Sequence, residues 1–360
     1  MEIIYPDLIA KALQLPLPQV RNTIGLLESG ATIPFISRYR KEMTGGLNEV
    51  QITDVKNWLD KLTELKARKD TILKALEKQE KLTPELKARI ESSWDSNEIE
   101  DIYLPYKPKR VTRAEMARKK GLEPLAKLIA AQKEPFLSGR VPAFVQGEVK
   151  DEEEALSGAR DIIAEWVNEN ERTRNQVRFA FRQAVISAKV IKGKEEEGAK
   201  YRNYFQFEEK LSRCQSHRLL AVRRGEEEGF LRVSIAPADD DACLESLYRQ
   251  YKRNNGACWE QFQLAIDDAY KRLLKPSIES EFARSSKQKA DEEAIRVFAD
   301  NLRQLLLAPP LGQKRVLGID PGYRTGCKVV CLDAQGNLLH NETIYPEEGR
   351  DQNSTFGGGL

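Results

Sequence analysis

The stretch NEVQITDVKNWLDKLTELKARKDTILKALEKQ, residues 48–79, decides the fold class of this 360-residue chain. Its apolar side chains recur at alternating steps of three and four residues, the spacing that places them along one side of an α-helix. They are Val55, Trp58, Leu62, Leu65, Ile72 and Leu76. Lys69 interrupts this stripe once. A stripe this narrow is typical of helix-on-helix packing, so we predict a long helix from 48 to 79.

Helix start signals surround this segment. Thr83 precedes Pro84, and a proline fits the first helical position because its missing N–H has no partner there anyway. Thr112 and Glu115 have the capping-box spacing. The acidic run at 151–154 suits a helix N-terminus, where the helix dipole favours negative charge. We therefore predict further helices beginning near 84, 113 and 152.

The first three hundred residues are predominantly helical by this reading, with one short strand at 230–235. Residues 174–188 combine an arginine row with an adjacent apolar row and predict a single helix. The charged, glycine-bounded segment at 192–200 predicts a hinge. Pro276 is expected to kink or end the helix that precedes it.

The pattern changes after Pro310. Three apolar runs at 316–320, 327–332 and 338–345 are separated by turn residues, which predicts a β-meander at the start of a new domain. Cys327 and Cys331 share a face of the second run and are most simply core thiols. A three-stranded sheet with one uncovered face has marginal stability.

Composition narrows the function classes. Fifty-eight basic residues face 56 acidic ones, so the net charge is +2 and nucleic-acid affinity must come from local patches. Two histidines exclude a histidine-rich metal site, and the five cysteines lack the paired spacing of a zinc ribbon. We expect no cofactor. The sequence lacks a signal-peptide pattern and a membrane-length apolar run, so a cytoplasmic location is expected.

The strongest local charge is a basic segment between residues 107 and 120, which we take as the candidate nucleic-acid-binding site. Its members are Lys107, Lys109, Arg110, Arg113, Arg118, Lys119 and Lys120. Only Glu115 opposes them, so they can neutralise several phosphates. Tyr103 and Tyr106 precede the segment and are candidates for stacking on bases. The alternatives are a solvated loop or a basic surface that docks another acidic domain of the same protein.

Three other segments have features that are found in nucleic-acid-binding proteins. Arg174, Arg178 and Arg182 form a row along one helix. Arginines beside a core face more often lay their aliphatic stems along the packed apolar side chains than contact DNA. Residues 200–205, KYRNYF, either stack on single strands or anchor the core. Residues 33–58 resemble a helix-turn-helix, yet acidic residues near the start of its second helix favour an ordinary helical hairpin.

One stretch resembles a catalytic motif: GIDPGYRTG at 318–326, where Asp320 ends a strand before a glycine turn. It is not a phosphate-binding P-loop, because the Gly-Lys-Ser/Thr ending is absent. Two-metal nuclease chemistry needs several carboxylates around the ions, and this sequence supplies no later strands to carry them. We therefore expect no enzymatic activity. The alternative is a ribonuclease-H-like nuclease led by Asp320.

Several long motifs recur together in one order. They are GATIPFISRYRKE (30–42), TGGL (44–47), KLTPEL (81–86), DIYLPYKPKR (101–110), GLEPLA (121–126), KGKEEEGAKYR (192–202), SHR (216–218) and VLGIDPGYRTG (316–326). Over residues 1–346 the chain resembles the Tex family of bacterial RNA-binding transcription accessory proteins. The resemblance implies a helical N-terminal region with a helix-turn-helix part, a long central helix and a ribonuclease-H-like YqgF domain.

The resemblance also sets our expectations for organisation and role. We expect a mainly α fold, with a helical region at 1–312, the first strands of an incomplete YqgF α/β domain at 313–345, and a disordered tail at 346–360. The implied function is a non-enzymatic transcription accessory role, with RNA or DNA and the transcription machinery as partners and no membrane. We expect a scaffold role together with weak nucleic-acid binding through residues 107–120. The family's helix-hairpin-helix and oligonucleotide-binding parts have no counterpart here, so a frameshift or truncation fragment is the remaining alternative.

Overall fold

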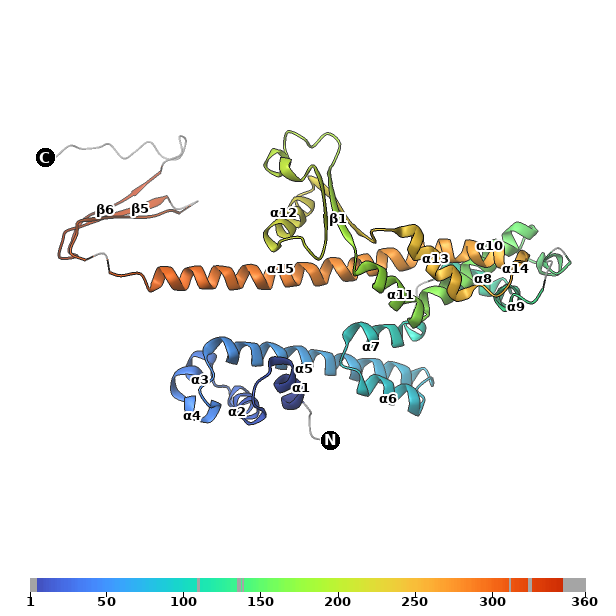
Figure 1. The fold of residues 1–360 in the computed structure, drawn as a ribbon, viewed down its shortest axis with the longest axis horizontal. Coiled ribbons are helices and arrows are strands. Elements are labelled where there is room, and N and C mark those ends of the chain that lie inside the picture. Colours follow the sequence, from blue (N-terminus) through green and yellow to red (C-terminus); the bar gives the residue numbers. More distant parts are fainter. Residues whose placement is uncertain are drawn as a thin grey trace. The chain divides into compact units, whose positions relative to one another are not determined.

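The computed structural model describes residues 5–108, 111–134, 137, 139–310, 312–322 and 326–345. The chain divides into two compact units, residues 1–290 and 291–360. Helices account for 64% of the residues, which confirms the predicted mainly α class. The ribbon is shown in Figure 1.

Seven helices open the first unit. They are α1 (Tyr5–Leu13), α2 (Leu17–Glu28), α3 (Ile33–Tyr39), α4 (Lys41–Thr44), α5 (Glu49–Lys78), α6 (Pro84–Ser92) and α7 (Ser96–Tyr103). The long helix α5 confirms the prediction, and Asn48 caps it in a box with Gln51. The side chain of Thr83 caps α6 by accepting a hydrogen bond from the Leu86 amide. Lys69, which interrupts the apolar stripe, is itself buried in α5.

Among the described residues, seven further helices form the central part of this unit. They are α8 (Arg113–Lys119), α9 (Glu123–Ala131), α10 (Glu152–Glu169), α11 (Glu171–Phe181), α12 (Ser216–Glu227), α13 (Asp240–Tyr251) and α14 (Ala257–Asp268). Of these, α8, α9, α11 and α14 pack against α10. Short 3-10 turns lie at Leu104–Tyr106, Val141–Phe144 and Ala199–Tyr204. Thr112 caps α8 and Asp151 caps α10, so both predicted starts are confirmed.

An antiparallel sheet interrupts the helices, in the order β2–β1–β3. Its strands are β1 (Val185–Val190), β2 (Gln206–Lys210) and β3 (Leu231–Ala236). Strand β3 confirms the predicted short strand. The prediction of one helix over 174–188 is wrong, because α11 ends at Phe181 and β1 begins four residues later. Alternate residues Ile186 and Ala188 are buried in β1, and α12 lies against this sheet (Figure 1).

The structure continues the helix through Pro276, where the sequence suggested a kink or an end. Helix α14 passes through a π-helical turn, η4 (Ala269–Leu274), into α15 (Lys275–Leu306), giving a helix of 50 residues. A proline ring in an α-helix presses against the carbonyl four residues earlier. The π turn, in which hydrogen bonds span five residues instead of four, lies directly before Pro276. It therefore changes the hydrogen-bond spacing of the backbone next to the proline ring.

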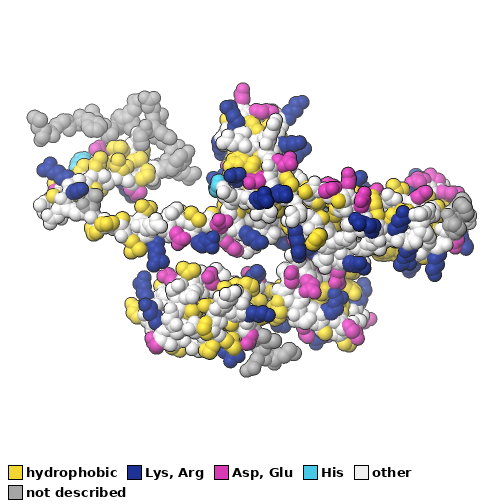
Figure 2. Space-filling view, in the orientation of Figure 1, with side chains coloured by type: hydrophobic (Ala, Val, Ile, Leu, Met, Phe, Trp, Pro, Cys, Tyr) yellow, Lys and Arg dark blue, Asp and Glu magenta, His cyan; other side chains and the backbone are white. Residues whose placement is uncertain are grey.

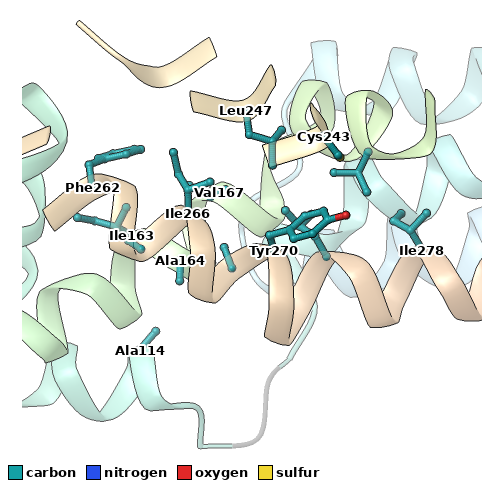
Figure 3. Packing of buried hydrophobic residues seen from close by; sticks show 14 of the residues in the cluster. Ala114, Ile163, Ala164, Val167, Cys243, Leu247, Phe262, Ile266, Tyr270 and Ile278 are labelled. Atoms are coloured by element: carbon teal, nitrogen blue, oxygen red, sulfur yellow. The ribbon is translucent and has the colours of Figure 1, made fainter. Parts of the chain in front are cut away.

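The main hydrophobic core gathers around this long helix (Figure 3). Phe262, Ile266 and Tyr270 face Ile163 and Val167 of α10. Helix α13 contributes Cys243 and Leu247 to the same cluster. Tyr270 is 1% exposed and stands first by volume among the fully buried side chains of the described residues. The π turn therefore carries a large anchor of this core.

The second unit contains the end of α15 and the antiparallel sheet β4–β5–β6. Its strands are β4 (Val316–Asp320), β5 (Cys327–Leu332) and β6 (Leu338–Ile344), as predicted for a meander. Asp333 shapes the turn before β6 by accepting hydrogen bonds from the Gln335 and Asn337 amides. Cys327 and Cys331 are half-buried in β5. The predicted disordered tail, 346–360, lies outside the described residues.

Candidate nucleic-acid interface

Helix α8 carries most of the described part of the basic segment, and it is held against α10 by small side chains. Ala114 and Ala117 of α8 are buried. Opposite them, a Cβ atom added to Gly158 of α10 would lie 2.4 Å from Leu122 Cδ1 and 3.3 Å from Ala117 Cβ. The glycine therefore permits the close approach of the two helices, and this fixes which side of α8 faces outward. Lys109 and Arg110 lie outside the described residues.

Two cations of the segment are joined to acids of α10. Arg118 Nη1 lies 2.7 Å from Glu165 Oε1, and Lys120 Nζ lies 2.6 Å from Glu154 Oε1. Thr112 also donates a hydrogen bond to Glu165. The hydrogen bond with Lys120 lowers the pKa of Glu154, while the same bond raises the pKa of Lys120. These pairs join the segment to α10 within the same compact unit, so they are contacts inside one unit and not the docking of another domain.

The remaining described cations face solvent. Lys107 and Arg113 are exposed, and neither forms an ion pair within the described ranges. Lys119 is exposed and lies 3.6 Å from Glu115 one turn earlier, a surface pair of the weak kind. The exposed positive charge of the described segment therefore comes from Lys107, Arg113 and Lys119.

The tyrosines before the segment differ from the prediction. Tyr103 is 6% exposed and packs in a cluster with Ile72 and Leu76 of α5, so its ring cannot stack on a base. Tyr106 is half-buried against the same cluster, and Lys81 Nζ lies 6.0 Å from its ring centroid. The sequence places both rings beside cations, but only the folding of α5 and α7 together shows that they fill a core.

The aromatic residues of KYRNYF, residues 200–205, anchor the core, which is the second of the two interpretations of this segment. Tyr201 is buried, and Tyr204 and Phe205 pack on the main core. Lys200 Nζ pairs with Glu228 at 2.6 Å and lies 5.1 Å from the Tyr201 ring centroid. The aromatic rings therefore anchor the loop between β1 and β2, and Arg202 stays exposed.

Two arginines of the predicted row, Arg174 and Arg178 of α11, form an ion-pair cluster with Asp101 and Glu281, here called the Asp101 cluster. Arg182 lies after the end of α11 and is exposed. Arg174 Nε donates to Asp101 Oδ1 at 2.6 Å, and Arg178 Nη2 donates to the same oxygen at 3.0 Å. Arg178 Nε also donates to Glu281 at 2.9 Å. The side chains of Asp101 and Arg174 are only 5% and 8% exposed. The row therefore joins α7, α11 and α15, as the non-DNA interpretation favoured.

Asp320 occupies the end of β4, as predicted, and is exposed opposite Lys328 of β5. Tyr323, Arg324 and Thr325 of the same motif lie outside the described residues. Among the residues that the structure describes, no three His, Cys, Asp or Glu side chains are grouped closely enough to hold a metal ion. Within the same residues, no helix has both the length and the apolar character needed to cross a membrane.

In residues 33–58, the short helices α3 and α4 precede α5. Gly45 and Gly46 lie between α4 and α5 and have left-handed conformations. Glu49 occupies the first turn of α5. Negative charge there stabilises the helix end through its dipole but repels phosphate. This favours the helical-hairpin interpretation over a recognition helix.

Cys214 gives a pH-dependent prediction. Burial, reinforced by the nearby Glu209 carboxylate, raises the pKa of its thiol to about 11 from 9.0. The thiolate is the reactive form, so the alkylation rate of Cys214 at pH 8 should be about 100-fold lower than that of an unperturbed thiol. This rate should increase with pH until about pH 11. Iodoacetamide labelling followed by peptide mass spectrometry across pH measures this. Labelling of Cys214 that levels off near pH 9 in the folded chain, as in a urea-unfolded control, would contradict the burial effect.

Three family models match the chain in sequence order. The Tex-like protein N-terminal domain matches residues 4–77, the Tex central region matches 138–298, and the Tex protein YqgF-like domain matches 314–356. The first covers α1 to α5, the second covers α10 to α14 with most of α15, and the third covers the β4–β5–β6 sheet.

Whole-chain relatives agree with these matches. The uncharacterized protein YdcI of Bacillus subtilis is 40% identical over 343 residues, 94% of this chain and 48% of that protein. The transcriptional accessory protein Tex of Neisseria gonorrhoeae is 37% identical over 357 residues, 97% of this chain and 47% of that protein. The human S1 RNA-binding domain-containing protein 1 is 27% identical over 341 residues, 90% of this chain and 34% of its own length. The chain spans about half the length of the curated bacterial relatives it matches.

Proposed function

Because the chain belongs to the Tex family, we propose that it is a non-enzymatic transcription accessory protein that contacts nucleic acid, RNA in the first place. The supporting observation is the match of its N-terminal, central and YqgF-like regions, in order, to Tex models. The names of the Neisseria and human relatives, which refer to transcription and to RNA binding, favour the same role.

We place the nucleic-acid contact of this part of the chain at the outward side of α8. Arg113 and Lys119 are exposed cations of α8, and Lys107 is an exposed cation before its start. Neither Lys107 nor Arg113 has an ion pair among the described residues, whereas Lys119 pairs weakly with Glu115. Three exposed positive charges in and before α8 give weak, salt-sensitive binding to phosphates and carry no base readout. The scaffold part of the role rests on the helices that the Asp101 cluster joins.

We retain the division into a helical region at 1–312 and a YqgF-like region from 313 as a proposal. This boundary keeps the end of α15 in the helical region, whereas the division into compact units places residues from 291 onward in the second unit. Limited proteolysis tests it: a first cut between Pro310 and Val316 supports the boundary, whereas a first cut inside α15 near Ala290 contradicts it.

The nucleic-acid contact is tested by removing two charges. The double variant Lys107→Ala, Arg113→Ala should bind single-stranded RNA more weakly and should reduce the slope of log K against log salt by about 1.4, because each phosphate contact contributes about 0.7. Arg113 is the first residue of α8, where a positive charge opposes the helix dipole, so its loss leaves the fold intact. Fluorescence anisotropy of labelled RNA and DNA oligonucleotides over a salt series measures the slope.

Two lysines of α5 supply a matched control. Lys74 and Lys78 are exposed and belong to the same compact unit, so Lys74→Ala, Lys78→Ala removes the same charge elsewhere. The proposal requires the slope to change only in the α8 variant. An equal change in both variants would mean that binding follows total charge, and RNA binding unaffected by either would exclude α8 as the contact.

A further inference from the structure

Helix α3 exposes two aromatic rings on a surface separate from the basic segment and from the Asp101 cluster. Phe35 and Tyr39 are one helical turn apart, with ring centroids 5.5 Å from each other. Phe35 is 39% exposed and Tyr39 is 63% exposed. Large aromatic side chains dominate the energetics of burial wherever they are covered, so a neighbouring pair left in water is a candidate contact surface.

The opposite side of α3 is fixed by packing, so the exposure of the rings does not come from a frayed helix. Ile36 is fully buried and clusters with Leu47, which precedes α5, and with Ile52 of α5. Ser37 is buried as well, and its hydroxyl donates to the Pro34 carbonyl at 3.1 Å. The two rings are therefore presented outward on a helix whose orientation is set by the core.

The surface extends to α4, which is anchored in turn to α2. Asn22 Nδ2 donates to the Met43 carbonyl at 2.7 Å, and Gln19 Nε2 donates to the Gly45 carbonyl at 3.3 Å. A Cβ atom at Gly45 would lie 2.4 Å from Gln19 Nε2, and the φ angle of +62° also favours glycine. The Met43 side chain, 44% exposed, is thus held on a firmly placed backbone.

Positive charge surrounds these apolar side chains. Arg38 and Lys41 are exposed, and the Arg40 guanidinium lies 5.1 Å from the Phe35 ring centroid. Glu42 is the sole acid between residues 35 and 43, so that stretch has a net charge of +2 from three basic residues and one acid. Figure 2 shows hydrophobic and basic side chains side by side at the end of the N-terminal helices that carries α3 and α4.

We propose that the α3–α4 surface, formed by Phe35, Arg38, Tyr39, Arg40 and Met43, is a docking surface for an acidic protein segment with apolar anchor residues. Phenylalanine, tyrosine, methionine and arginine are the residue types enriched in the buried centres of protein interfaces, and tyrosine and arginine supply many of their strongest contacts. The positive rim favours an acidic partner by charge complementarity.

The ring geometry favours protein over single-stranded nucleic acid. Arg40 occupies one face of Phe35, and the two rings are inclined by 43°. Successive bases stack nearly parallel to one another, and these rings do not form a parallel platform for them. Met43 adds a flexible aliphatic contact, which suits an apolar side chain of a peptide.

A peptide selection on the full chain tests the proposal without assuming a sequence. A phage library of random short peptides is selected on the wild-type chain, and the recovered peptides are measured against Phe35→Ser, Tyr39→Ser and against Arg38→Glu. We expect acidic peptides with aromatic or leucine residues, bound at least about tenfold more weakly by both variants. Leu264→Ser, an exposed apolar residue of α14, is the matched control and should bind like the wild type.

All three altered sites are exposed, so circular dichroism melts of the variants should match the wild type. Peptides that are neutral or basic, or that bind wild type and variants equally, would overturn the proposal. A labelled oligouridine RNA is measured in parallel. If it binds the wild type and loses as much affinity in Phe35→Ser, Tyr39→Ser as the peptides do, the surface belongs to nucleic acid and the proposal fails.

Discussion

Replacing Asp101 by alanine is expected to lower the free energy of unfolding of the first unit by about 3–5 kcal/mol. Asp101 is 5% exposed, and its two oxygens accept hydrogen bonds from Arg174 and Arg178. Among the described residues, its removal leaves the buried Arg174 guanidinium and the partly buried Arg178 guanidinium with only the Glu281 carboxylate beside them. Uncompensated buried charge costs far more than the net gain from a paired one, which explains the size of the effect.

Urea unfolding followed by circular dichroism measures this loss on the full chain. The matched control is Asp70→Ala, because Asp70 forms an exposed pair with Lys66 one turn away on α5, at 2.8 Å. Exposed pairs of this kind contribute about 0.3–0.5 kcal/mol. If Asp101→Ala were no more destabilising than Asp70→Ala, the Asp101 cluster would not be what joins α7 to α11 and α15.

Local sequence signals identified helices where the cause of the helix is itself local. The apolar spacing of α5 and the caps at Thr83, Thr112 and Asp151 all depend on residues within a turn or two of one another. Strand β1 was missed for the complementary reason. Val185 and Ala188 continue the helical spacing of α11. Only pairing with β2 and β3, whose paired residues are 17 to 51 positions away, makes this segment extended.

Candidate site residues were harder to judge, because their partners are distant along the chain. Lys120 is 34 residues from Glu154, and Arg178 is 77 residues from Asp101. A basic run looks unpaired until the helices that carry its acids are placed beside it. The same holds for Lys69: its ammonium donates to the Glu91 carbonyl at 2.9 Å and lies 3.8 Å from the Trp94 ring centroid. What seemed an interruption of the apolar stripe is a buried contact between α5 and α6.

Truncating Tyr270 to alanine should destabilise the first unit by about 3–5 kcal/mol, the range for removing a large aromatic side chain from a core. The ring is 1% exposed at the π turn, between α10 and α13 (Figure 3). Its hydroxyl donates to Asp240 Oδ1 at 2.6 Å, and the other Asp240 oxygen pairs with Lys275. The measurement is urea unfolding, with Leu264→Ala on the exposed side of α14 as the control, expected to change stability by less than about 0.5 kcal/mol.

Tyr270→Phe separates the two contributions of this residue. It keeps the ring in the core but removes the donor to Asp240, so the expected loss is about 1–2 kcal/mol, the range for one buried hydrogen bond. Lys275 still neutralises Asp240 in this variant, which keeps the loss small. If phenylalanine were as destabilising as alanine, the hydrogen bond to α13 would hold the π turn in place. If alanine were as mild as the Leu264 control, the turn would be supported by backbone geometry alone, and the position of Pro276 would explain it better than the packing of Tyr270.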